Sequence, residues 1–421
     1  MSSVLRETPP VVPDPYTLSL EDVDPAKVDV FQQDALWSYF KRLRDEDPVH
    51  FHPDSDYGPY WSITRFDDIM FVDSHHELFS SEGGITIGPL KKYEERASEF
   101  RTPMFIAMDP PKHDVQRATV TGVVAPRNLA KLESTIRERA GRILDSLPVG
   151  ETFDWVDNVS IELTTQMLAT LFDFPFEERR KLTYWSDVAT AGPEAYDFDE
   201  RRAILLECLE YMTRLWNERK DQPPGDDLDL ISMLAHGENT KHMQPMEFLG
   251  NLILLIVGGN DTTRNSISGG VLALNQHPEQ YDKLRHDHSL VNTMVPEIIR
   301  WQTPLSHMRR TALEDVKLGG KTIRKGDKVV MWYVSGNRDE TAIDRPDEFI
   351  IDRARPRHHL SFGFGIHRCM GNRLAEMQLR VLWEEILQRF HTVEVVGEPQ
   401  RSASVFVKGY THLPVKLHAL Q

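Results

Sequence analysis

Apolar residues along the chain recur mainly at helical spacing. A short pattern of this kind covers residues 34–47 and ends just before Pro48. The longest one begins near Pro245, a residue suited to a first helical turn, and stops at Gln276, where His277 and Pro278 follow. Further helices are expected over residues 112–220, 290–301 and 372–390. These patterns predict a chain built mainly of helices.

Short β-like runs lie between the helical patterns, at residues 49–51, 60–64, 316–318, 321–323, 328–332, 392–396 and 405–407. Residues 1–30 are rich in Pro, Asp and Ser and are expected to form an extended arm. The segment 80–111 contains several Gly and Pro residues and is typical of a binding loop. The fold class is therefore predicted to be mainly α with a small β part.

Composition and charge exclude several classes of protein. The chain has 421 residues and a net charge of −16, which argues against broad binding to nucleic acid. Its two cysteines, Cys208 and Cys369, are too few for a disulfide framework and favour a reducing compartment. The longest apolar run, residues 252–257, is far shorter than the roughly 20 residues that a membrane span needs. The protein is expected to be cytoplasmic and not membrane-spanning.

One cysteine stands among glycines in the segment 362–371, directly before a helical pattern. A helix N-terminus and nearby cations favour the thiolate form of a cysteine, and glycines let the backbone approach a large flat ligand. Taken alone, a cysteine such as Cys369 is more often a small buried hydrophobe. A zinc site with His358, His359 and His367 lacks the usual ligand spacing.

The spacing of five residues identifies the segment as similar to a known signature. Phe362, Gly365, His367, Cys369 and Gly371 match the haem-binding signature of the cytochromes P450. The resemblance extends from about residue 30 to residue 414. It implies a single cytochrome P450 domain over residues 1–421, with a long central helix over a buried haem b (iron protoporphyrin IX). It also implies that Cys369 is the ligand of the haem iron, where a thiolate favours cleavage of the O–O bond.

A second motif is the pair Glu297 and Arg300, which share a helix face at i and i+3. Such a pair is usually an ordinary surface ion pair. Here it resembles the structural Glu-x-x-Arg pair of the family. The resemblance implies a further partner for Arg300 within residues 352–355, and the sequence does not choose among them.

The middle of the long helix carries a third motif. Gly258 and Gly259 are adjacent inside a helix, where each costs about 1 kcal/mol relative to Ala. One explanation for the two glycines is close helix packing through small residues, with Asp261 on a solvated face. The segment also resembles the oxygen-activating part of the family's central helix. In that resemblance the glycines make room for dioxygen, while Asp261 and Thr262 are catalytic and deliver protons. Thr262 can also bond to the carbonyl of Gly258.

Haem carries two carboxylates, so cationic and imidazole donors are expected away from the cysteine. His113 and Arg117 resemble the family's His-x-x-x-Arg pair, and Arg310 resembles the arginine that precedes a β segment. His367 is the fourth expected partner, and Arg309 remains an alternative to Arg310.

The implied reaction is monooxygenation, with O2 as co-substrate and two electrons from NAD(P)H. The resemblance implies a ferredoxin and a ferredoxin reductase as partners of a monomeric enzyme. A basic stretch could steer the ferredoxin, or could be a scatter of surface arginines; it contains Arg353, Arg355, Arg357, Arg368, Arg373 and Arg380.

The expected substrate is an apolar small molecule. Residues 258–266 and 357–362 resemble bacterial alkane and fatty-acid terminal hydroxylases, which oxidise the end methyl group of medium-length chains. A terpene or steroid hydroxylase is the alternative, and a haem-thiolate peroxide isomerase or a haem sensor belongs to a different class. Position in the family suggests a lining of Ile85, Ile87, Leu254, Leu305, Met308, Val405 and Phe406.

Overall fold

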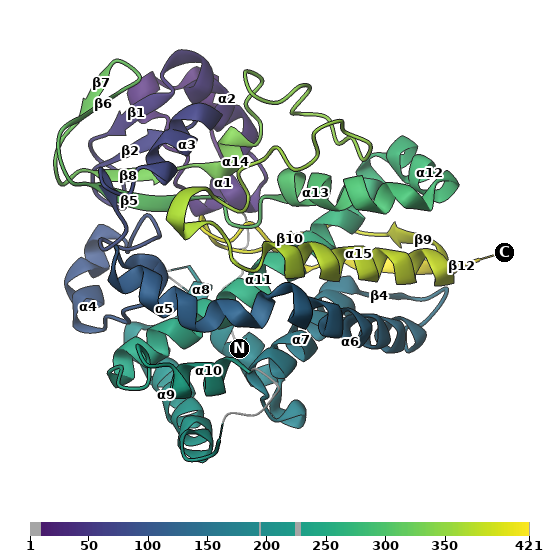
Figure 1. Ribbon diagram of the computed structural model, residues 1–421. Helices are drawn as coiled ribbons and strands as arrows, with labels where there is room; N and C mark the ends of the chain where they lie inside the picture. The colour runs from purple at the N-terminus through teal and green to yellow at the C-terminus, as the bar shows by residue number, and fades with distance from the viewer. Residues whose placement is uncertain (1–9, 193–194, 224–228, 421) are drawn as a thin grey trace.

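The computed structural model describes residues 10–192, 195–223 and 229–420. Helices make up most of the molecule, and the strands gather at two of its edges (Figure 1). The α-helices are α1 (Val28–Gln32), α2 (Leu36–Glu46), α3 (Phe66–Ser74), α4 (Glu94–Glu99), α5 (Lys112–Thr121), α6 (Pro126–Asp145), α7 (Glu162–Phe172), α8 (Arg180–Thr190), α9 (Phe198–Lys220), α10 (Leu230–His236), α11 (Pro245–Gln276), α12 (Pro278–His286), α13 (Val291–Gln302), α14 (Tyr333–Gly336) and α15 (Asn372–Arg389).

The strands form four small sheets. The largest has five strands in the order β1-β2-β8-β5-β3, in which β2 and β8 are parallel and the other pairs are antiparallel. A second sheet has the order β4-β12-β9 and lies beside α15 (Figure 1). The strands are β1 (Val49–His52), β2 (Tyr60–Ile63), β3 (Phe79–Ser80), β4 (Thr152–Asp154), β5 (Met308–Ala312), β6 (Val316–Leu318), β7 (Lys321–Ile323), β8 (Lys328–Met331), β9 (Phe390–Val395), β10 (Gln400–Arg401), β11 (Tyr410–His412) and β12 (Pro414–Ala419).

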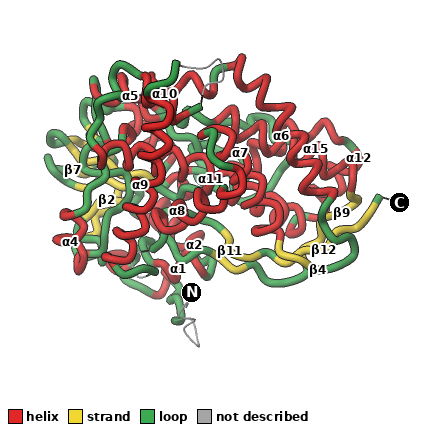
Figure 2. Tube along the Cα trace, turned by 90° about the horizontal axis from the view of Figure 1, so that it is seen from below, coloured by secondary structure: helices red, strands yellow, loops and turns green. Residues whose placement is uncertain are grey.

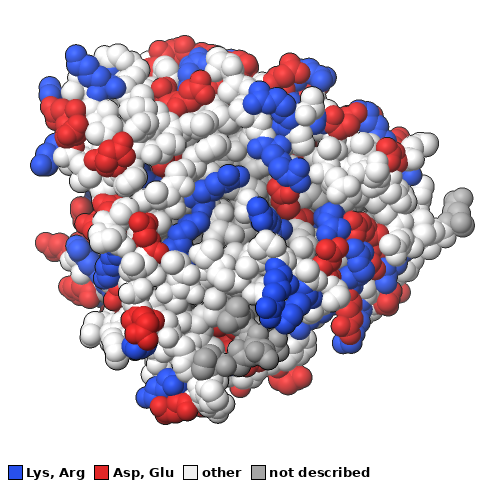
Figure 3. Space-filling view, in the orientation of Figure 1, with Lys and Arg blue, Asp and Glu red and all other residues white. Residues whose placement is uncertain are grey.

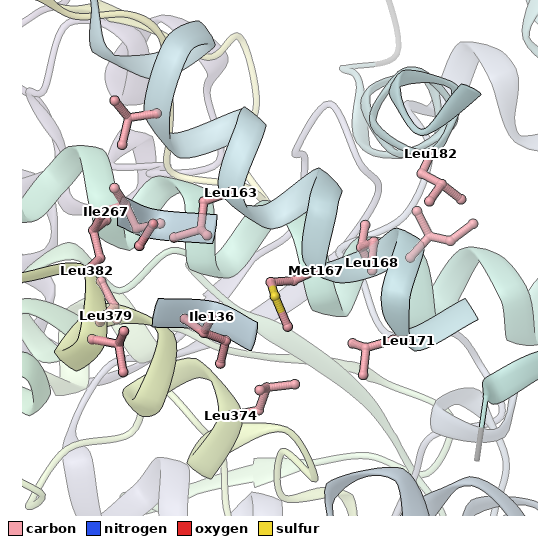
Figure 4. Packing of buried hydrophobic residues seen from close by; sticks show 14 of the residues in the cluster. Ile136, Leu163, Met167, Leu168, Leu171, Leu182, Ile267, Leu374, Leu379 and Leu382 are labelled. Carbon is pink, nitrogen blue, oxygen red and sulfur yellow. The ribbon is translucent and has the colours of Figure 1, made fainter. Parts of the chain in front are cut away.

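Helix α11 runs through the middle of the molecule (Figures 1 and 2). It begins with Pro245 in its first turn and ends where Pro278 starts α12, because His277 adopts the non-helical backbone that a following proline favours. It packs against α7, α8, α13 and α15. Apolar side chains of α6, α7, α8, α11 and α15 form the main core, as Figure 4 shows for Ile136, Met167, Leu182, Ile267 and Leu379.

A second apolar cluster joins the N-terminal segment to the five-stranded sheet. The arm expected over residues 1–30 is extended only in part. The described portion has 3-10 turns at Pro15–Thr17 and Leu20–Asp22, and it reaches α1 within residue 30. Val23 and Ala26 are buried, because they pack into this cluster. Residues 1–9 lie outside the described residues.

Most predicted elements are confirmed. The long helix has the predicted bounds, as do β6 and β7, and α2, α13 and α15 agree within about two residues. The prediction of a strand at residues 405–407 is wrong, because only an isolated bridge joins Leu305 to Val407 there. The strands β4, β5 and β12 were not expected from the pattern. None of the described helices is long and apolar enough to cross a membrane.

Candidate active site

Cys369 lies in a tight loop between a 3-10 turn (Gly365–His367) and α15. Its backbone N–H donates to the carbonyl of Phe362 at 2.8 Å, which closes the loop. Gly365 has a φ of +65°, and a Cβ there would lie 2.4 Å from the carbonyl oxygen of Asp73. The glycine is therefore required both by the turn and by the close approach of α3.

Many protein atoms surround Cys369, yet its side chain remains accessible to solvent. Burial raises the pKa of the thiol, and the N–H groups of Gly371 and Asn372 together with the positive charges of Arg117 and Arg368 oppose that rise. These groups stabilise negative charge on the sulfur, as a thiolate ligand needs.

Two histidines and two arginines gather close to the cysteine loop. The rings of His113 and His367 lie 4.3 Å apart, on α5 and in the cysteine loop. Burial lowers the pKa of His367 to about 2, and the positive charge of Arg310 contributes next, followed by His113 and Arg117. One ring nitrogen of each histidine, Nδ1 of His367 and Nε2 of His113, is buried without a hydrogen-bond partner within the described residues.

This arrangement fits the carboxylates of a haem, since unpartnered buried nitrogens and neighbouring cations both favour an anionic ligand. All four partners predicted from the sequence therefore lie together. The structure also separates the two adjacent arginines. Arg310 is buried and donates to Asp73 at 2.7 Å on the side of His367, whereas Arg309 projects from the opposite face of β5.

Helix α11 presents an open face on its middle turns. Leu254 and Thr262 are half-buried on this face, and Gly258 between them is exposed, with no atom within 4 Å of a Cβ built there. Oγ1 of Thr262 donates to the carbonyl of Gly258 at 3.0 Å, as predicted. Gly259 serves a different purpose, because a Cβ there would lie 2.7 Å from Leu168 of α7. The expectation that Gly259 makes room for dioxygen is therefore wrong, and its role is close helix packing.

Asp261 points away from this open face and is fully buried. It pairs with Arg264 at 2.6 Å and accepts a hydrogen bond from Oγ of Ser186 at 2.6 Å. Arg264 also pairs at 2.6 Å with Asp187, whose side chain is 44% exposed. Burial raises the pKa of the Asp261 carboxyl. Asp261 is not on a solvated face, and a chain of charged groups connects it to the surface on α8.

Glu297 and Arg300 form a buried ion pair that holds the cysteine side of the fold together. Both side chains are fully buried, and the guanidinium of Arg300 donates to both carboxylate oxygens of Glu297 at 2.8 Å. Arg300 also bonds to the carbonyls of Asn337, Pro346 and Glu348.

Within the range 352–355, Arg353 is the residue that joins this pair. It bonds to the carboxylate of Glu297 at 3.0 Å rather than to Arg300. Glu297 therefore accepts bonds from two arginines, and the three residues form one buried triad. A surface ion pair, the ordinary explanation for this spacing, does not apply.

The expected substrate-lining residues divide into two groups. Leu254, Leu305, Met308, Ile85 and Phe406 are half-buried, and the structure leaves their role as a lining untested. Ile87 and Val405 are buried in the second apolar cluster, and their role as a lining likewise stays a prediction.

His307 connects the segments that carry these residues. Its Nε2 accepts from the N–H of Ile87 at 3.0 Å, and its Nδ1 lies 3.1 Å from the carbonyl of Val405. Burial lowers the pKa of His307 to about 3, so the ring is neutral near pH 7. Nδ1 therefore carries the proton, since a carbonyl can only accept. This histidine carries no signal in the sequence, because an isolated His in an apolar segment is common.

Three features together define a haem-thiolate oxygenase: a cysteine in a tight loop before α15, His and Arg side chains clustered beside it, and a long central helix with an open face at Gly258 and Thr262. The chain belongs to the cytochrome P450 family, whose model matches residues 196–407, and it is a cytochrome P450 monooxygenase. It is 36% identical over 408 residues to linalool 8-monooxygenase of Pseudomonas putida, covering 94% of this chain and 99% of that one.

Two further comparisons agree. The chain is 33% identical to methyl-branched lipid omega-hydroxylase of Mycobacterium tuberculosis, over 97% of this chain and 96% of that one. The solved structure of cytochrome P450-153 from Novosphingobium aromaticivorans superimposes with a TM-score of 0.88 at 48% identity, over 95% of this chain and all of that one. The predicted family and fold are confirmed.

The family implies haem, which supplies the oxygen chemistry when bound. Cys369 would hold the iron, and His113, Arg117, Arg310 and His367 would hold the carboxylates. The protein's own contribution is to position groups and supply protons. The open face of α11 leaves space at Gly258, and the hydroxyl of Thr262 lines the same face. Polar and charged groups of α8 connect Asp261 to the surface, and burial raises the pKa of its carboxyl, so it is protonated more readily than an ordinary aspartate.

Replacing Thr262 tests the delivery of protons. Thr262→Ala is expected to consume NADPH at a rate within a few-fold of the wild type while most reducing equivalents appear as hydrogen peroxide, because the hydroxyl on the open face is lost. The ratio of product formed to NADPH consumed measures this coupling. Thr263→Ala is the matched control, since Thr263 is buried on another face of α11. Unchanged coupling in Thr262→Ala would remove Thr262 from proton delivery.

Proposed function

We propose that this monooxygenase hydroxylates the terminal methyl group of medium-chain linear alkanes or fatty acids. One oxygen atom of O2 enters the C–H bond to give the primary alcohol. The other leaves as water, and two electrons from NAD(P)H and two protons complete the balance. The observation that carries the proposal is the open, partly apolar face of α11, on which Leu254 and Thr262 flank the exposed Gly258.

Similarity to known terminal hydroxylases supports linear chains as the substrate class. Residues 258–266 and 357–362 resemble the alkane and fatty-acid terminal hydroxylases, and one relative is named a methyl-branched lipid omega-hydroxylase. A terminal methyl has the strongest C–H bond of the chain. Attack there therefore requires that the substrate be held end-on to the iron.

Product regiochemistry tests the proposal. The haem-loaded enzyme would be supplied with a ferredoxin, its reductase and NADPH, and given octane, dodecanoic acid or a monoterpene alcohol. We expect octan-1-ol and 12-hydroxydodecanoic acid as the main products. Subterminal alcohols as the main products, or no turnover of either linear substrate, would refute terminal hydroxylation.

A second candidate substrate class is a terpene alcohol, because linalool 8-monooxygenase matches nearly the whole chain. Efficient oxidation of the monoterpene alcohol, with linear substrates inert, would establish this alternative. A haem-thiolate peroxide isomerase or a haem sensor would show no turnover that depends on NADPH.

We also propose that an acidic ferredoxin docks on the cysteine side of the molecule. Lys and Arg side chains gather on the face that carries α5, the cysteine loop and the start of α15 (Figure 3). Arg368 and Arg373 are exposed beside Cys369. The predicted basic stretch is only partly a surface feature, because Arg353 is buried on Glu297, while Arg357 and Arg380 pair with acidic neighbours.

Charge reversal at this face is expected to slow association with the ferredoxin. Arg373→Glu should raise the ferredoxin concentration needed for half-maximal reduction about tenfold at low salt, and the difference should shrink as salt rises. Stopped-flow reduction at several ionic strengths measures this. Arg324→Glu, on the β6–β7 hairpin, is the control with the same change of charge. Equal effects of the two variants would count against docking at the cysteine side.

A further inference from the structure

The outer face of β5 carries donors for which the oxygen chemistry has no use. Side chains alternate along a strand, so Arg309 and Thr311 point to the face opposite Arg310. Lys328 of β8 is the cross-strand partner of Thr311 and shares this face. Three hydrogen-bond donors, two of them cationic, therefore lie on adjacent positions of one sheet.

The segment 83–88 covers these donors closely. A Cβ on Gly83 would lie 2.3 Å from Oγ1 of Thr311 and 3.1 Å from Nη2 of Arg309. A Cβ on Gly88 would lie 3.5 Å from Nζ of Lys328 and 3.6 Å from Nη1 of Arg309. The two cations thus lie under one loop, and at Gly83 only a glycine leaves room for the side chain of Thr311.

These donors are poorly satisfied by the protein. Nε of Arg309 and Oγ1 of Thr311 are buried and have no hydrogen-bond partner in the described part of the chain. No ion pair of Arg309 is found among the described residues, and the carboxylate that acts on it, Glu94, is exposed. Nζ of Lys328 donates to the carbonyl of Tyr57 at 2.6 Å.

The pKa of Lys328 is consistent with two cations that lie close together. Burial, and next the positive charge of Arg309, lower the pKa of Lys328 to about 8. Two half-buried cations side by side without a paired carboxylate are unfavourable, so binding of an anion between them would be favoured.

We propose that Arg309, Thr311 and Lys328 form a binding site for the carboxylate of a linear amphiphilic substrate. This inference rests on the proposed function and selects its acid branch. A guanidinium binds a carboxylate through two parallel hydrogen bonds, and a hydroxyl and an ammonium can serve the remaining lone pairs. The acid group would then be held away from the iron while the methyl end is oxidised.

The loop that covers the donors also leads to the haem side. Ser81 bonds to His367 at 2.9 Å, and Gly84, only three residues later, lies over Arg309. The N–H of Gly84 donates to the carbonyl of Ser81 at 3.0 Å, so a tight turn connects the segment over the donors to the haem side. Half-buried Ile85 and Met308 lie on the two segments between these points and supply apolar contacts.

Matched ligands test the site. Dodecanoic acid and dodecan-1-ol have the same chain and differ in charge, and both would be titrated into the haem-loaded ferric enzyme, following the Soret band and the heat of binding. Arg309→Gln should weaken the acid about tenfold or more, as expected for losing a charged hydrogen bond, and the alcohol by less than about twofold. Arg309→Lys should recover part of the preference. Arg324→Gln, an exposed arginine of the β6–β7 hairpin, is the control for net charge.

The outcomes separate the inference from the proposed function. Equal weakening of acid and alcohol, or no weakening of the acid, would overturn the carboxylate site while leaving terminal hydroxylation standing. Binding heat that depends on Arg309, with no Soret shift and no terminal product, would uphold the site and overturn the proposed function. If dodecanoic acid does not bind at all, both are wrong.

Discussion

Cys369→Ser is expected to abolish thiolate-ligated haem. A hydroxyl does not ionise near neutral pH even where the N–H groups of Gly371 and Asn372 would stabilise an anion. The ferrous carbon monoxide complex of the variant should therefore lack the strongly red-shifted Soret band, and monooxygenase turnover should fall below detection. Absorption spectra of enzyme reconstituted with haem measure the ligand directly.

Cys208→Ala provides the control for this experiment. Cys208 is fully buried in α9, and burial raises the pKa of its thiol well above the ordinary value. This variant should keep the red-shifted band. Only its stability should fall, and the loss should be no larger than the removal of one small buried side-chain group causes. A red-shifted band that persists in Cys369→Ser and disappears in Cys208→Ala would reverse the assignment.

Glu297→Gln is expected to destabilise the fold by about 3–5 kcal/mol, since it leaves Arg300 and Arg353 as buried charges without a carboxylate. The amide keeps the shape, so the loss reports on charge rather than packing. Guanidinium unfolding, followed together with the carbon monoxide spectrum, measures it. Asp352→Asn breaks the exposed pair with Lys283 and should change stability by less than about 1 kcal/mol. Similar losses in the two variants would contradict a central role for the triad.

The triad also predicts a dependence on pH. Burial raises the pKa of Glu297, but the bonds from Arg300 and Arg353 outweigh it, so the pKa is lowered overall in the folded protein. The ionised form is thus stabilised by folding at neutral pH. That contribution is lost as pH falls below the ordinary glutamate value and through the lowered pKa. Glu297→Gln should remove this part of the acid sensitivity.

The sequence was sufficient for the family and for residues defined by local spacing. Five specified positions within ten residues identified the cysteine loop, and i and i+3 spacing placed Glu297 beside Arg300. Partners contributed by distant segments were harder. Arg353 could not be chosen within the charged stretch 352–355, and the interactions of Asp73 with Arg310 and of Ser186 with Asp261 have no sequence signal, because they depend on tertiary packing.

The rotation between successive residues of a helix explains why the two adjacent glycines of α11 have different roles. Gly258 and Gly259 are adjacent, so their positions on the helix differ by about 100°. One faces the open side of α11 and the other faces Leu168 of α7. Both residues are glycine, so only the packing of α11 shows which of the two leaves space.

The imidazole of His307 couples two segments of the chain, and this affects how substitutions can change substrate specificity. It joins the segment with Ile87 to the segment with Val405 through its two nitrogens, and each bond fixes the tautomer required by the other. Substitutions in these two segments should therefore be epistatic, with combined effects on substrate range that the single variants do not add up to. When substrate specificity changes, in natural relatives or in laboratory variants, we therefore expect substitutions in both segments together.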